Sequence, residues 1–174
     1  MEYLVAKPRS KRDIEQVAYN IRKTLKLEKH LYFPIVEFIE NILPQIDTNF
    51  SYEYCELADM PKNTYAFYNP TDNIMHIRED VYEAACKDDG RHRFTLAHEV
   101  GHYFLHSEDV ILRRSASKFE IKPFENPEWQ ANTFAGALLI PNNLIKNMSI
   151  SQIASQCRTS YQAAEIAYKK SRAQ

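Results

Sequence analysis

The chain has 174 residues, of which 44% are hydrophobic and 26% charged, and its net charge is −1. These values are those of an ordinary globular protein of about one domain, and they exclude collagen-like, low-complexity and wholly disordered chains. Only 3 glycines are present, and neither glycine-rich phosphate-binding motif occurs, which excludes the common nucleotide-binding loops.

The cysteines and the lengths of the apolar runs indicate in which cellular compartment the protein is expected. Cys55, Cys86 and Cys157 are widely spaced and form no C-x-x-C pair, so we expect reduced thiols in a reducing compartment. The first 13 residues contain no apolar stretch of signal-peptide length. The longest apolar run, residues 134–140, is too short to span a bilayer. The sequence therefore predicts a cytoplasmic protein without a membrane segment.

The first 50 residues are predicted to form helices. Apolar side chains between residues 14 and 25 recur at helical spacing, and Asp13 is expected to cap that helix. A second apolar stretch, residues 35–43, predicts another helix, with Pro34 near its first turn and Pro44 at its end.

The pattern then changes to short segments rich in aromatic and β-branched residues, at 50–54, 64–68 and 73–78, with turn sequences between them. We expect a small antiparallel three-stranded sheet. Helical patterns return at residues 81–86, 91–105 and 128–139. Residues 107–126 read as irregular, and residues 151–170 read as two short helices. Helices, a small sheet and further helices predict an α+β fold.

The segment with the clearest chemistry is the H-E-x-x-H motif of His98, Glu99 and His102. Two histidines four residues apart share one face of a helix, so both imidazoles can bind one metal ion. Glu99 would act on a water at that metal, because zinc lowers the pKa of water towards 7 and a carboxylate can then accept its proton. The apolar flanks indicate a buried helix, in which such polar side chains are costly without a partner.

A catalytic zinc site needs a third protein ligand and an open position. His106 lies eight residues after His98, about 12 Å along a helix, so one ion cannot hold both on an unbroken helix. We expect His106 to end the helix or to support a ligand. Glu128, at the start of the later helix, is the favoured third ligand, and Glu120 and Glu125 are weaker alternatives.

Asn132 lies one turn after Glu128 on the same helix face. Its side chain can hydrogen-bond the second nitrogen of a ligating histidine, or the Glu128 carboxylate. No residue for stabilising an oxyanion stands out, although Tyr103 and Tyr65 are candidates.

The motif Arg-Phe-Thr-Leu-Ala-His-Glu-Val-Gly-His at residues 93–102, with Glu-x-x-Ala-Asn-x-Phe-Ala-x-x-Leu-Leu-x-Pro at residues 128–141, resembles the ImmA/IrrE family of zinc metallo-endopeptidases. The resemblance covers about residues 52–141. It implies a zincin-like core of the gluzincin type, with one zinc ion held by His98, His102 and Glu128 and with Glu99 as general base. It also implies a place beside phage or mobile-element repressors, and cleavage of such a helix-turn-helix repressor, with consequences for transcription.

The sequence thus predicts a single metallopeptidase domain: N-terminal helices at residues 1–50, a zincin core at 51–141 and a helical tail at 142–174. The expected partner is a transcriptional repressor or an antitoxin-like regulator, and the strand at 73–78 is a candidate for pairing with the substrate backbone. The tail, with five basic residues and one acidic residue, resembles a helix-turn-helix in outline, but DNA binding is the less favoured hypothesis. The alternative function is a regulatory or toxin–antitoxin-type binding protein that keeps the zinc fold and acts through protein or DNA contacts.

Overall fold

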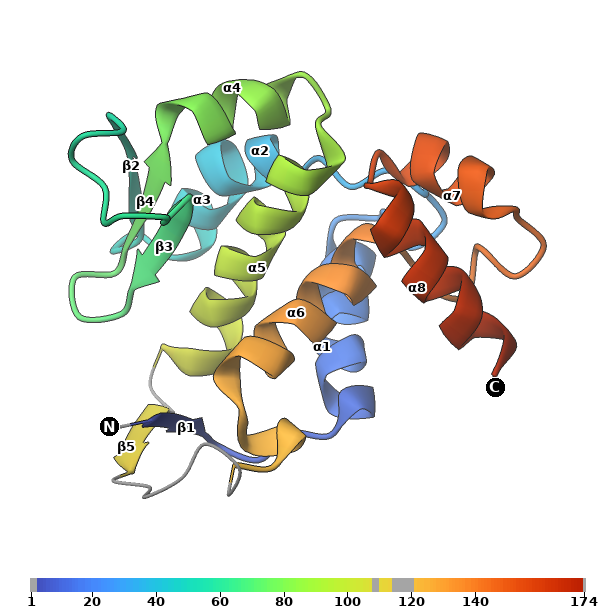
Figure 1. The fold of residues 1–174 in the computed structure, drawn as a ribbon, viewed down its shortest axis with the longest axis horizontal. Coiled ribbons are helices and arrows are strands. Elements are labelled where there is room, and N and C mark those ends of the chain that lie inside the picture. The colour runs from blue at the N-terminus through green and yellow to red at the C-terminus, as the bar shows by residue number, and fades with distance from the viewer. Residues whose placement is uncertain (1–2, 108–109, 114–120, 174) are drawn as a thin grey trace.

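The computed structural model describes residues 3–107, 110–113 and 121–173 (Figure 1). It has a mixed α+β fold in which the long helix α5 (Gly90–His106) lies between a small sheet and helix α6 (Pro127–Leu139). None of the described helices has the length and apolar character needed to cross a membrane.

The α5–α6 contact is the centre of the fold. At their crossing, a Cβ added to Gly101 of α5 would come within 3.1 Å of Ala131 of α6, so the glycine lets the two backbones approach closely. Fully buried side chains of both helices belong to the hydrophobic core, among them Leu96, Phe134 and Leu138. This close crossing brings the first turns of α6 beside the middle of α5.

The N-terminal helix α1 (Lys11–Thr24) packs against α6. Its cap is Ser10, whose side chain accepts from the Asp13 backbone while the Asp13 carboxylate accepts from Ser10. The prediction that Asp13 itself caps the helix was therefore wrong by three residues. Asp13 is the third residue of a capping box, a position from which a carboxylate also satisfies an N-terminal N–H group.

The predicted second helix is a sequence of three short elements: α2 (Ile35–Glu37), a π-helical turn η1 (Phe38–Ile42) and α3 (Leu43–Ile46). The helical backbone continues past Pro44 to Ile46. Proline has no N–H to donate, and it follows the wide π-helical turn of η1 and lies in the first turn of α3, where a missing N–H is tolerated.

The sheet contains β2 (Ser51–Cys55), β3 (Ala66–Asn69) and β4 (Ile74–Arg78) in the order β2-β4-β3. Strand β3 is antiparallel to β4, but β2 is parallel to it. The expected all-antiparallel sheet was therefore wrong, because β3 and β4 form a hairpin and β4 then lies beside β2 in the same direction. Strand β4 is central and its two edges are already paired, so residues 73–78 cannot accept a substrate strand.

Helix α4 (Glu79–Cys86) follows directly from β4, and Asp89 caps α5 by accepting from the backbone N–H groups of Arg91 and His92. After α5, β5 (Val110–Arg113) pairs with β1 (Tyr3–Ala6) in an antiparallel ribbon. Neither strand was predicted, since each has four residues and its partner is about 100 residues away in the chain. A 3-10 turn, η3 (Pro123–Glu125), precedes α6.

The tail forms α7 (Ile150–Cys157) and α8 (Tyr161–Arg172), as predicted, with Arg158 in the left-handed conformation between them. The turn packs on the start of α5, where a Cβ at Gly90 would lie 2.3 Å from the backbone of Thr159 and Ser160. The buried Arg93 of α5 donates to the carbonyl of Arg158 at 3.0 Å and to that of Phe33 at 2.7 Å. The tail is therefore docked on the body of the fold.

Candidate metal centre

Three side chains predicted as metal ligands meet where α5 crosses α6. The Nε2 atoms of His98 and His102 are 3.0 Å apart. The carboxylate of Glu128 reaches both, with Oε2 3.2 Å from His98 Nε2 and Oε1 3.3 Å from His102 Nε2. The structure thus brings the two imidazole nitrogens together with both oxygens of the carboxylate, one oxygen beside each nitrogen, at contacts of 3.0–3.3 Å.

These contact distances are close to the separation of ligand atoms around a tetrahedral zinc ion. With bonds of about 2.0–2.1 Å, two ligand atoms of a tetrahedral site lie about 3.3 Å apart. The three observed contacts are within about 0.3 Å of this separation. Two imidazoles and one carboxylate are also the donor set typical of catalytic zinc, with a fourth position left open.

The local sequence explains why the third ligand arrives here. Asn126 caps α6 by accepting from the backbone N–H groups of Glu128 and Trp129, which fixes Glu128 in the first helical turn. Because Gly101 and Ala131 let α5 and α6 come close, this first turn faces the histidines of α5.

His98 is oriented by Asn132. The Nδ1 atom of His98 lies 3.0 Å from Oδ1 of Asn132. With the amide oxygen as acceptor, Nδ1 carries the proton and Nε2 has its lone pair directed into the cluster. This is one of the two contacts expected for Asn132.

A longer hydrogen-bond chain orients His102. Its Nδ1 lies 3.0 Å from Nδ1 of His106, and Nε2 of His106 lies 3.0 Å from Oε1 of Gln130. The Gln130 amide group donates to the carbonyls of Lys7 and Phe124, at 2.9 and 2.7 Å, so its oxygen must be the acceptor.

The proton positions follow from this chain. His106 donates from Nε2 to Gln130 and therefore accepts at Nδ1, so His102 donates from Nδ1 and keeps its Nε2 lone pair for the cluster. Burial lowers the pKa of His106 to about 4, which keeps it neutral, as the chain requires. Sequence reasoning placed His106 in a supporting role but missed Gln130, because nothing in the pattern of α6 distinguishes it from a solvent-facing glutamine.

Glu99 is nearly buried, 8% exposed, and lies beside the cluster. Its Oε2 accepts from the backbone N–H of Tyr68 on β3 at 3.0 Å. Burial raises the pKa of Glu99, and the neighbouring His98 and His102 oppose this shift. The carboxylate is thus held between the strand edge and the histidines, with an increased affinity for a proton.

The three cluster residues are electrostatically coupled. Hydrogen bonding to His102 and His98 holds the pKa of Glu128 far below its usual range. Burial alone would lower the pKa of His98, but Glu128 and Glu99 outweigh it and raise the pKa. Glu128 therefore supplies a permanent negative charge next to the two imidazoles.

The other residues considered from the sequence lie elsewhere. Tyr103 donates to Asp47 at 2.9 Å, and the Tyr65 ring lies under the guanidinium groups of Arg78 and Arg91. Glu125 is in η3, and the described residues that can share a metal at this crossing are His98, His102 and Glu128. Glu120 falls outside the described residues.

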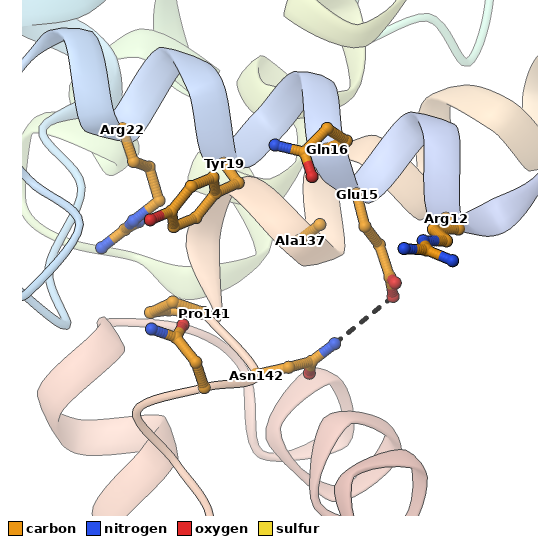
Figure 2. Close-up of a pocket in the computed structure, with 9 residues that line it drawn as sticks. Arg12, Glu15, Gln16, Tyr19, Arg22, Ala137, Pro141 and Asn142 are labelled. Carbon is orange, nitrogen blue, oxygen red and sulfur yellow. Dashed lines mark hydrogen bonds between the residues drawn. The ribbon is translucent and has the colours of Figure 1, made fainter. Parts of the chain in front are cut away.

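A groove of about 960 Å³ begins at Glu128 and Asn132 and continues between α6 and α8. Apolar and basic side chains are among those that line it, including Phe94, Trp129, Ile166, Lys11, Arg91 and Lys170. A smaller hollow of about 240 Å³ lies near the other end of α6, between α1 and residues 141–143 (Figure 2). There Glu15 accepts from Asn142 at 3.3 Å. None of the three cluster residues lines this hollow, although it shares Glu15, Ala137 and Asn142 with the groove.

These features define a class: an α+β protein with two imidazoles and one carboxylate arranged as a potential metal site on a pair of crossing helices. The chain belongs to the peptidase family described as the IrrE N-terminal-like domain, whose sequence profile matches residues 51–167. The family that the two motifs resemble is therefore confirmed. A comparison with curated proteins finds no significant match.

Among solved structures, the chain resembles a Mycobacterium tuberculosis transcriptional regulator with a TM-score of 0.56 and 15% sequence identity. The similarity covers 87% of this chain and 45% of the other, so this chain spans less than half of that protein's length. At this sequence identity, the comparison shows that the two proteins share a fold and nothing more.

Proposed function

We propose that the chain is a zinc-dependent endopeptidase with one zinc ion held by His98, His102 and Glu128. The observation that carries the proposal is the hydrogen-bond pattern around the histidines. Asn132 and the His106–Gln130 pair each satisfy the outer nitrogen of one imidazole, which leaves both Nε2 lone pairs directed at one point beside an ionised carboxylate. A histidine pair with no metal role would not need this arrangement of outer partners.

Zinc bound there would supply Lewis-acid chemistry, which polarises a peptide carbonyl and makes water acidic. Glu99 would accept the proton of the attacking water and later deliver it to the leaving amine. Its Oε2 is held by the N–H of Tyr68, so we assign the proton transfer to Oε1. The raised pKa of Glu99 suits this role, because a general base works best when its pKa is near the working pH.

The substrate backbone would pair with β3 rather than with β4. Strand β3 is an edge of the sheet, and its Tyr68 N–H points away from β4 towards Glu99. Because peptide groups alternate along an antiparallel strand, the groups of Ala66 point to the same free edge. An extended peptide added at this edge would pass directly beside the general base.

The groove between α6 and α8 would receive the substrate on one side of the cleaved bond, since Glu128 and Asn132 lie in its wall. Its apolar lining suits hydrophobic side chains. Its charged lining residues are Lys11, Arg91 and Lys170 against Glu15 and Glu128, which favours acidic residues in the bound segment.

We further propose that the substrate is a helix-turn-helix transcriptional repressor or a related regulator in the cytoplasm. The support is the family membership, together with the resemblance of the two motifs to ImmA/IrrE peptidases. The structural neighbour named as a transcriptional regulator fits this context. The described cysteines are free thiols, which fits a reducing compartment.

The test combines metal content with cleavage. Wild-type protein, Glu99→Gln, His102→Ala and Glu128→Ala are loaded with zinc, dialysed and measured by mass spectrometry. Each is then incubated with a proteome-derived peptide library to detect new termini. We expect Glu99→Gln to keep zinc and lose cleavage by at least about 100-fold, whereas the ligand variants lose both.

Glu125→Gln, an acidic residue outside the cluster, is the matched control and should cleave as wild type does. Cleavage by Glu99→Gln at the wild-type rate would refute the peptidase mechanism. If zinc bound and no variant or wild type cleaved any peptide, a binding protein that keeps the metal fold would be the better explanation.

A further inference from the structure

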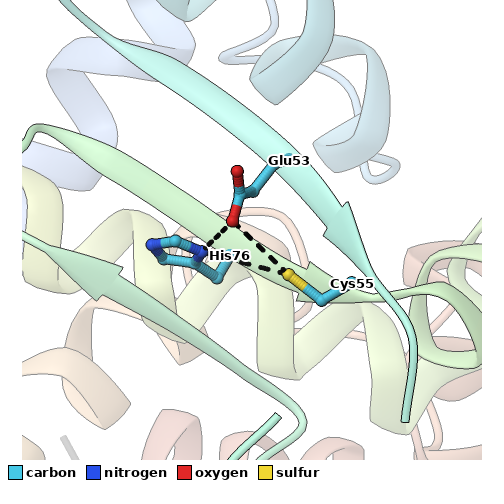
Figure 3. A group of neighbouring side chains, drawn as sticks. All are labelled: Glu53, Cys55 and His76. Carbon is cyan, nitrogen blue, oxygen red and sulfur yellow. Dashed lines mark hydrogen bonds and ion pairs between the residues drawn. The ribbon is translucent and has the colours of Figure 1, made fainter. Parts of the chain in front are cut away.

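A second group of metal-binding side chains lies on the sheet, away from the helix crossing. Glu53 and Cys55 belong to β2, and His76 belongs to β4 (Figure 3). Among the described residues, this group and the cluster at α5 and α6 are the two sets of three whose ligand atoms lie close enough for one ion.

The strand register explains why these three meet. Glu53 is directly opposite His76 in the parallel pair, and Cys55 is two residues further along β2, on the same face. Met75 and Ile77 of β4 are buried in the core, so the alternate residue His76 points to the other face of the sheet. The group thus lies on the face opposite to the one that packs on α5.

The imidazole is held in place before any ion binds. Phe67 of β3 is opposite His76 and stacks on it, with ring centroids 4.4 Å apart and planes at 16°. Nδ1 of His76 lies 2.6 Å from Oε1 of Glu53, and Sγ of Cys55 lies 3.7 Å from the same oxygen and 3.9 Å from Nδ1. All three potential ligand atoms therefore face a common point.

These distances can be compared with those in a tetrahedral site. Bonds of about 2.3 Å to sulfur and about 2.0–2.1 Å to nitrogen and oxygen require separations of about 3.6 Å from sulfur and about 3.3 Å between nitrogen and oxygen. The two sulfur distances already agree within about 0.3 Å. The short contact between Glu53 and His76 must open, and the Glu53 side chain is 54% exposed and free to move.

The local charge also favours a cation. The Glu53 carboxylate lies 3.7 Å from the Cys55 sulfur, and the carboxylate of Asp59 adds a second negative charge nearby. These negative charges would attract a divalent ion.

We propose that Glu53, Cys55 and His76 form a second metal site, for a borderline-soft divalent transition ion of the zinc class. One sulfur, one imidazole nitrogen and one carboxylate oxygen exclude the hard cations magnesium and calcium, which take oxygen ligands. The site is independent of the proposed peptidase function, because it shares no residue with the cluster at His98, His102 and Glu128.

The presence of sulfur gives a direct test. Full-length reduced protein without metal is titrated with Co²⁺, and the near-ultraviolet band from thiolate-to-cobalt charge transfer is recorded. The helix cluster contains no sulfur, so the band reports the second site. We expect the band in wild type and in His102→Ala, and we expect it to be absent from Cys55→Ser.

Two further variants complete the design. Cys86→Ser removes an exposed thiol outside the group and should leave the band unchanged. Glu53→Gln should weaken Co²⁺ binding at least about tenfold, the loss expected even for an outer partner of a ligand. Circular dichroism of Cys55→Ser verifies folding. A band that survives Cys55→Ser in folded protein, or no band in wild type, would overturn the proposal.

Discussion

Replacing Gln130 with leucine tests whether the hydrogen-bond chain behind His102 prepares the metal site. Gln130 is fully buried and makes three hydrogen bonds, to His106, Lys7 and Phe124. Leucine has a similar volume but makes none of them. Each lost hydrogen bond costs about 1 kcal/mol, so we expect a loss of about 3 kcal/mol in the free energy of unfolding.

For a chain of this length that loss corresponds to a fall in Tm of about 6–12 °C. The effect on the metal is separate. Without Gln130, His106 can donate from Nδ1, and then His102 must present its protonated Nε2 to the cluster. We therefore expect zinc affinity to fall by about 10–100-fold, as for other outer partners of metal ligands.

The assay is a competition titration with a chromophoric chelator, together with a thermal melt. Gln156→Leu, on the exposed side of α7, is the matched control and should change stability by less than about 0.5 kcal/mol. A folded Gln130→Leu protein with wild-type zinc affinity would refute the positioning role, and a loss of stability alone would show that the bonds are only structural.

Two further predictions concern the glycines and the metal. Gly90→Ala should lower the Tm by about 2–10 °C, because its Cβ would lie 2.3 Å from the backbone of Thr159 and Ser160. Gly136→Ala should raise the Tm slightly, because a Cβ there meets open space and alanine favours a helix over glycine. Equal melting temperatures for the two variants would contradict the packing of the tail on α5. In the Cys55→Ser background, protein in zinc at about 100 times the zinc Kd should lose about 2.7 kcal/mol of its free energy of unfolding when the zinc is removed. The same removal should not change the free energy of unfolding of Glu128→Ala. A shift of equal size in Glu128→Ala would contradict its assignment as a ligand.

The sequence predicted local structure well where a single periodicity of apolar residues dominates a segment. The helix at 91–105 was predicted within one residue of each observed end, because its apolar spacing is regular and buried. The turn at Arg158 between two tail helices was also predicted from its polar break. The meeting of His98, His102 and Glu128 followed from helical spacing plus a second motif, although their role as zinc ligands stays a prediction.

Relations between distant segments could not be predicted in the same way. Alternation along residues 74–78 shows which side chains face the core, but it does not identify the neighbouring strands, so the central place of β4 and its parallel pairing with β2 were missed. Gln130 was missed for the same reason. Its partners, the carbonyls of Lys7 and Phe124 and the ring of His106, come together only in the folded chain.

The buried guanidinium of Arg93 has a consequence for the motions of the molecule. It binds Phe33 from the N-terminal half, Asp88 before α5 and Arg158 in the tail, and it is 1% exposed. Undocking of the tail would leave part of a buried cation without its acceptors, which is far more costly than the fraying of an ordinary terminus. Amide hydrogens in the first turn of α5 and around Arg158 should therefore exchange with solvent together, in openings close to global unfolding.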